Sequence, residues 1–68
     1  MEQNLSLYYV FHTVAKKGSI SHAAKELYIS QPAISKSIQK LEDNLNTTLF
    51  KRSSRGVTLT ADGEILFQ

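Results

Sequence analysis

The segment 31–40 carries side chains that can form hydrogen bonds with the edges of nucleic-acid bases or with phosphate groups. On a wheel of about 100° per residue they share the outward face of one predicted helix with small residues that permit close approach. The members of this face are Gln31, Pro32, Ala33, Ser35, Lys36, Gln39 and Lys40. Carboxylates follow only at Glu42 and Asp43. We predict that this helix, residues 31–44, enters the major groove of DNA, although an ordinary amphipathic surface helix has the same periodicity.

A second basic group lies where two β-prone runs, residues 49–52 and 57–60, flank a turn rich in Ser and Gly. The pattern predicts a β-hairpin that packs on the helices through Leu49, Phe50, Val57 and Leu59. Its DNA-facing residues are predicted to be Arg52, Ser53 and Arg55. Arginines on a projecting loop can enter a narrow minor groove or bind phosphates. A solvated turn is an equally good interpretation of these residues alone.

Residues 18–45 must position the side chains of segment 31–40, and their pattern indicates two helices joined by a short turn. One apolar stripe comprises Ile20, Ala23, Ala24 and Leu27, and the next comprises Ile34, Ile38, Leu41 and Leu45. Ser19 and Ser30 can cap the two helices, and Pro32 fits the first turn because its missing N–H has no intrahelical partner there. Helix, three-residue turn and helix form the helix-turn-helix layout.

Two further helices are predicted at the ends of the chain. The first spans residues 4–17, buries Tyr8, Phe11, Val14 and Ala15, and ends at Gly18. The other begins at Ala61 after the capping Thr60, and it stops on an apolar cluster after two turns, so we expect a fragment of a longer protein. His12 and His22 lack ligand spacing and are expected at the surface, without a metal or other cofactor.

Composition limits the class of protein. Sixty-eight residues allow one small domain, and the absence of cysteine excludes a disulfide framework. No apolar run reaches the roughly 20 residues of a membrane span, and we expect a cytoplasmic protein. The net charge is +2. The basic excess lies in residues 35–56, which contain five basic residues and two acidic ones. No phosphate loop or activated nucleophile is present, so we expect no enzyme.

The order of these motifs resembles the N-terminal DNA-binding domain of LysR-type transcriptional regulators. The resemblance covers all 68 residues. It rests on Ala23-Ala24 with Leu27, the SQPAIS run at 30–35, Leu41-Glu42, the LF.R pattern at 49–52, Arg55-Gly56 and the LT..G pattern at 59–63. One departure is Lys36, where many members of the family have Arg, and Lys cannot form the bidentate pair that Arg makes with guanine.

The resemblance implies a mainly α winged helix-turn-helix, with a DNA-binding domain at residues 1–60 and the start of a linker helix at 61–68. It implies that the third helix reads the major groove, that the hairpin is a wing at the minor groove, and that the linker helix pairs with a second copy. The implied partners are an inverted-repeat double-stranded DNA and, through a further domain absent from these residues, a small-molecule co-inducer. A winged fold that binds another protein is the alternative, in which the basic surface is only solvated.

Overall fold

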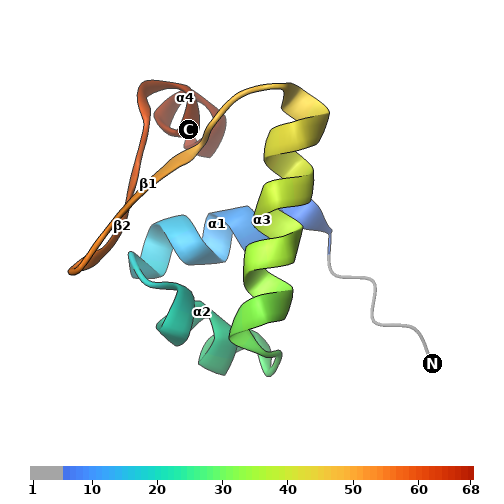
Figure 1. Ribbon diagram of the computed structural model, residues 1–68, viewed down its shortest axis with the longest axis vertical. Helices are drawn as coiled ribbons and strands as arrows, with labels where there is room; N and C mark the ends of the chain where they lie inside the picture. Colours follow the sequence, from blue (N-terminus) through green and yellow to red (C-terminus); the bar gives the residue numbers. More distant parts are fainter. Residues whose placement is uncertain (1–5) are drawn as a thin grey trace.

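The computed structural model describes residues 6–68, which form four helices and one β-hairpin. Figure 1 shows the hairpin at the side of the helices. The elements in chain order are α1 (Leu7–Lys17), α2 (Ile20–Leu27), α3 (Gln31–Leu45), β1 (Phe50–Ser53), β2 (Gly56–Leu59) and α4 (Ala61–Phe67). The predicted mainly α architecture with a small β-hairpin is confirmed. Within residues 6–68, no helix is both long enough and apolar enough to cross a membrane.

Each helix begins at a hydroxyl residue, as local capping chemistry predicts. The hydroxyl oxygens of Ser19 and Ser30 accept from the backbone N–H of His22 and Ala33, both at 3.2 Å. Thr60 accepts from Gly63 N–H at 3.0 Å in the same way. Of the predicted first helix, residues 4 and 5 lie outside the described part, and Ser6 is the N-cap, so α1 starts at Leu7.

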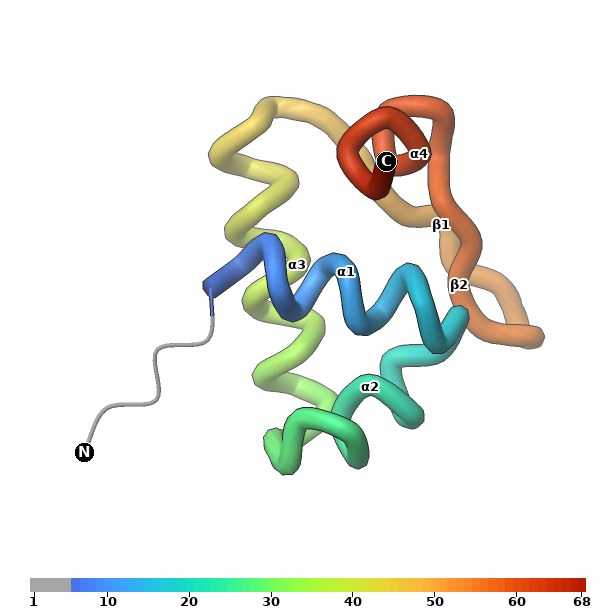
Figure 2. Tube along the Cα trace, turned by 180° about the vertical axis from the view of Figure 1, so that it is seen from behind, coloured from blue at the N-terminus to red at the C-terminus, as the bar shows by residue number. Residues whose placement is uncertain are grey.

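Helices α1, α2 and α3 each pack against the other two, and Figure 2 shows α1 crossing the middle of α3. Leu49 and Phe50, at the start of the hairpin, cover the apolar core between these helices. The buried apolar residues are Val10, Phe11, Val14, Ala23, Ala24, Ile34, Ile38, Leu49 and Phe50. The apolar stripes predicted for α2 and for the first part of α3 therefore do face the core.

Two predicted core residues are exposed. Leu45 keeps 46% of its surface, because the last turn of α3 extends beyond the point where α1 crosses it. Tyr8 keeps 44%, and Val10, which the sequence pattern missed, is buried at 1% in its place. His12 was also expected at the surface, but its ring packs against the ring of Phe67 in α4, with 4.8 Å between the ring centroids.

Each strand of the hairpin lies one residue closer to the turn than predicted, so β1 is one residue later in the chain and β2 one residue earlier. Phe50 pairs with Leu59 and Ser53 pairs with Gly56, which leaves Ser54 and Arg55 as a two-residue turn. The pairing extends into the predicted turn because Gly56 adopts a backbone conformation with φ of 121°. At the other end Thr60 leaves the strand to cap α4, and its hydroxyl also donates to Thr48 O at 2.7 Å. The hairpin is thereby tied to the start of α4.

A candidate nucleic-acid interface

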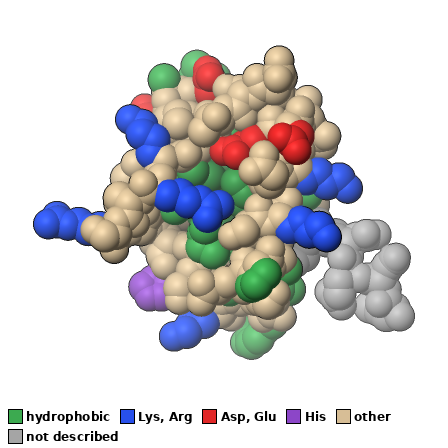
Figure 3. Space-filling model, viewed as in Figure 1, with side chains coloured by type: hydrophobic (Ala, Val, Ile, Leu, Met, Phe, Trp, Pro, Cys, Tyr) green, Lys and Arg blue, Asp and Glu red, His purple; other side chains and the backbone are tan. Residues whose placement is uncertain are grey.

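The N-terminal half of α3 is an exposed face without carboxylates. Five of its predicted contact residues are exposed, namely Gln31, Pro32, Lys36, Gln39 and Lys40, whereas Ala33 and Ser35 are half-buried. Figure 3 shows this side of the molecule, with basic side chains over its middle, its lower part and both flanks, and acidic ones in the upper part, toward the end of α3 and α4. The separation favours a polyanion along the first part of α3 and disfavours one near the end of that helix.

One residue of this face is already engaged. The side-chain amide Nε2 of Gln39 donates to Oδ1 of Asp43 at 3.0 Å, an i to i+4 pair on the exposed side of α3. Both groups are exposed, so the bond exchanges readily with water and stabilises the helix only slightly. The side-chain amide of Gln39 is therefore turned toward Asp43, while its second N–H and its carbonyl oxygen can still bind another partner.

The predicted residues of the hairpin do not share one role. Arg52 and Arg55 are exposed, and Arg55 lies in the turn itself. The hydroxyl of Ser53 instead accepts from Arg55 N–H at 3.2 Å and donates to Gly56 O at 3.4 Å. These bonds hold the turn that presents Arg55, which is a role inside the hairpin that its residue type alone does not reveal.

Backbone groups of the hairpin bind two distant parts of the chain. At the base, Oε2 of Glu42 on α3 accepts from Leu49 N–H at 2.7 Å and from Phe50 N–H at 3.3 Å. Near the turn, Val57 N–H donates to the carbonyl of Gly18, at the end of α1, at 3.2 Å. The sequence pattern assigned no such task to Glu42 or Gly18, since neither contact follows from helical or strand periodicity. The hairpin is therefore supported at both ends.

A hollow of about 420 Å³ lies between the start of α2 and the hairpin. Its lining includes Arg52 and Arg55 together with the serines Ser19, Ser21 and Ser54. Ser19 and Ser21 were not predicted as site residues, because their place beside the hairpin arises only from the fold. The two arginines and the start of α2 thus face one another across a single groove.

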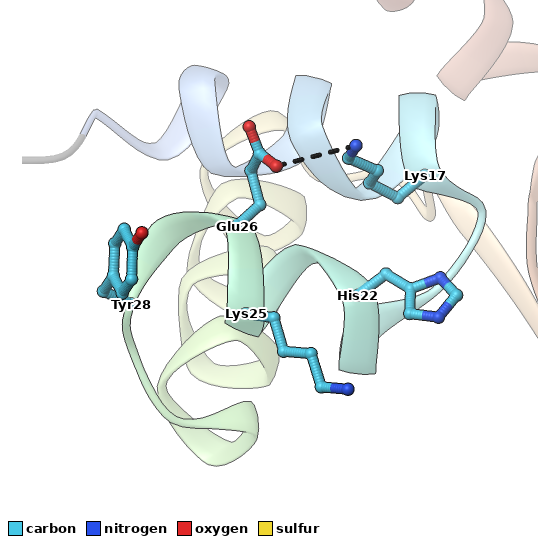
Figure 4. Close-up of a pocket in the computed structure, with 5 residues that line it drawn as sticks. All are labelled: Lys17, His22, Lys25, Glu26 and Tyr28. Atoms are coloured by element: carbon cyan, nitrogen blue, oxygen red, sulfur yellow. Dashed lines mark ion pairs between the residues drawn. The ribbon is translucent and has the colours of Figure 1, made fainter.

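A second hollow, of about 520 Å³, lies along α2 and the end of α1 and is drawn in Figure 4; it is lined by Lys17, His22, Lys25, Glu26 and Tyr28. Lys17 Nζ lies 3.6 Å from Glu26 Oε1, and this ion pair joins the end of α1 to α2. Tyr28 projects almost fully into solvent from the turn before α3, with φ of 57°. Residues 6–68 contain no cluster of three or more His, Cys, Asp or Glu that could hold a metal ion.

The family comparison matches almost the whole chain. Residues 5–64 fit the model of the bacterial regulatory helix-turn-helix proteins of the lysR family. The transcriptional regulator GltR of Bacillus subtilis strain 168 is 51% identical over 63 residues, which are 93% of this chain and 21% of GltR. A probable RuBisCO transcriptional regulator of Emiliania huxleyi is 49% identical over 57 residues, 84% of this chain and 18% of that protein. The chain therefore spans about a fifth of the length of these curated relatives.

Solved structures share the fold. The crystal structure of the CbnR DNA-binding domain in complex with DNA is 41% identical, with a TM-score of 0.87 over 90% of this chain and 70% of that one. The BenM DNA-binding domain in complex with benA site 1 DNA is 38% identical, with a TM-score of 0.88 over all of this chain and 77% of that one. Both similar chains were crystallised with the kind of ligand that the exposed face of α3 suits.

Proposed function

Since this chain belongs to the LysR family of bacterial regulatory helix-turn-helix proteins, we propose that it binds double-stranded DNA with α3 in the major groove and the β1–β2 wing at the minor groove. The observation that carries the proposal is the exposed first part of α3, which has no carboxylate before Glu42, beside a hairpin whose turn holds Arg55. The similar domains of CbnR and BenM, crystallised with DNA, support it. So do the curated relatives, which are transcriptional regulators.

The residues divide between base recognition and phosphate binding. Gln31, Ser35, Lys36 and Gln39 are placed to reach base edges, and Pro32 and Ala33 allow the backbone of the first turn to come close. Lys40 and Arg52 bind phosphates, and Arg55 enters the minor groove. Lys36 forms single rather than bidentate hydrogen bonds, so the base preference at its position differs from that of an Arg.

We further propose that residues 61–68 begin a helix that pairs two copies of the protein on an inverted repeat, with residues 1–60 as the DNA-binding part. Ile65 on α4 is 67% exposed, and a hollow of about 350 Å³ that includes Leu45 and Leu66 lies beside it. Two recognition helices would then meet half-sites roughly 34 Å apart. Sedimentation of the intact protein tests this, because Ile65→Glu should shift the dimer toward monomer, and an unchanged dimer would contradict the pairing. A co-inducer would bind outside residues 1–68.

A salt titration of DNA binding tests the main proposal. Fluorescence anisotropy on a duplex selected from a random pool should show that Lys36→Ala and Arg55→Ala each weaken binding. Lys40→Ala and Arg52→Ala, which remove the proposed phosphate contacts, should also lower the slope of log affinity against log salt by about 1. Lys16→Ala, which removes an exposed lysine outside α3 and the wing, is the matched control and should change neither quantity.

Unchanged affinity in Lys36→Ala and Arg55→Ala, together with an unchanged salt slope in Lys40→Ala and Arg52→Ala, would refute the assignment of α3 and the wing. Binding with no preference for the selected duplex over random competitor would instead favour a protein-interaction module.

A further inference from the structure

The wing rests on the junction of α1 and α2 through a contact between two glycines. Figures 1 and 2 both place the end of α1 beside the hairpin. Gly18 O accepts from Val57 N–H at 3.2 Å, and a Cβ added at Gly56 would lie 2.5 Å from the same oxygen. Ordinary contact requires at least 3.4 Å, so any side chain at Gly56 must move the hairpin away by about 1 Å. The close approach therefore depends on glycine at this position.

The Gly18 peptide also belongs to the helix-turn-helix pair. Gly18 ends α1 in the left-handed conformation, with φ of 68° and its N–H bonded to Val14 O. The next residue, Ser19, is the N-cap of α2. The carbonyl that receives the wing is thus fixed within two residues of both helices, and the wing takes its orientation from them.

Without this contact the wing would be supported near its base and by the partly buried side chain of Val57, which packs against the core, but not at its exposed turn. Phe50 is buried, whereas the three residues of β1 that follow it are exposed. At about 3.3 Å per residue the turn lies roughly 10 Å beyond Phe50, so a tilt of about 10° at the base moves the turn by about 2 Å. That displacement is large for an arginine that must enter a minor groove about 6 Å wide.

We infer that Gly56 is a positioning residue for DNA recognition, which acts through its contact with Gly18 to hold Arg55 at the minor groove. The inference rests on the proposed function of the wing. Gly56 itself need not touch DNA. Its effect is exerted through Arg55, so its substitution should matter only while Arg55 is present.

A double-mutant cycle separates this role from a structural one. The intact protein is titrated with two duplexes that share the selected core, one flanked by A-tracts with a narrow minor groove and one by G·C pairs. Arg55→Ala should reduce the preference for A-tract flanks roughly tenfold, the effect of one hydrogen bond to a charged group. Gly56→Ala should reduce it to the same extent, and the double variant should lose no more than either single variant.

A stability control and an amide-exchange measurement complete the test. Val10→Ala removes buried side-chain volume from α1, outside the DNA-facing residues, and should lower the melting temperature while keeping the A-tract preference. Hydrogen exchange at Val57 N–H reports the contact with Gly18 directly, and Gly56→Ala should accelerate it.

Retained A-tract preference in Gly56→Ala, or additive losses in the double variant, would overturn the inference. If Arg55→Ala leaves binding unchanged, the proposed role of the wing fails together with the role of Gly56 in recognition. Val57 exchange then shows separately whether the glycine contact holds the wing.

Discussion

The recognition helix α3 and the wing face the same proposed ligand but are positioned by different forces. Ile34 and Ile38 anchor α3 in the core at 0% and 2% exposure, so apolar packing sets its place. The wing has one fully buried end, and beyond it the partly buried side chain of Val57 and hydrogen bonds from backbone N–H groups to Glu42 and Gly18 hold the hairpin. Packing is spread over many atoms, whereas the wing depends on a few polar contacts and on a glycine. Single substitutions should therefore affect the two regions very differently.

The largest expected effect is on both regions at once. Ile34→Ala removes buried side-chain atoms from the contact between α3 and the rest of the core, which should cost about 2–5 kcal/mol of unfolding free energy. In so small a domain, helix and wing should be lost together in a urea titration followed by circular dichroism. Tyr28→Ala, at a residue that is 94% exposed, should cost within about 0.5 kcal/mol. A similar cost for the two variants would show that packing does not position α3.

A smaller effect should be confined to the wing. Glu42→Ala leaves the N–H groups of Leu49 and Phe50 without their acceptor, at a cost of about 1–3 kcal/mol. Amide exchange should accelerate at these two residues while the middle of α3 stays protected. Glu42→Gln keeps one neutral acceptor oxygen and should restore part of the protection of the Leu49 and Phe50 amides from exchange. Equal acceleration in α3 would break the distinction between the two regions.

The smallest effect should be confined to the start of α3. Ser30→Ala removes the acceptor of Ala33 N–H and should cost about 1 kcal/mol. Ser37→Ala, which removes a hydroxyl from the interior of the same helix, should stay within about 0.5 kcal/mol. Thermal denaturation gives both values, and unchanged exchange at Val57 N–H would show that the wing is independent of this cap. Faster exchange there would indicate that the two regions are coupled.

The fold was predictable where local chemistry decides it. The hydroxyl caps at Ser19, Ser30 and Thr60, and the left-handed helix end at Gly18, depend on neighbouring residues, and the sequence pattern locates them correctly. Leu45 and Tyr8 were misplaced because periodicity gives a helix face but not where a crossing helix stops covering it. Each strand lies one residue closer to the turn than predicted. Gly56 joins the strand pairing instead of the turn, and Thr60 caps α4 instead of ending β2.

The candidate site divides in the same way. The exposed residues of α3 follow from helical periodicity, since one face of a helix is defined by spacing alone. The contacts of Gly18 with the wing and of Glu42 with Leu49 do not, because they join segments far apart in the chain through backbone groups. Ser53 shows the limit most clearly, since its hydroxyl is satisfied inside the turn. Residue type predicted Ser53 to face DNA, and the hydrogen bonds of its hydroxyl within the turn are an additional role that residue type does not reveal.

The hydrogen bond between Gly18 and Val57 also bears on how the chain folds. Its partners lie 39 residues apart, whereas α1, α2 and α3 are joined by short turns. Closing the longer loop costs more entropy, and no gain follows until both segments are in place. We therefore expect the three helices to assemble first and the wing to dock last. Early in synthesis or refolding, the chain would then hold a formed recognition helix beside a hairpin that is still free to move.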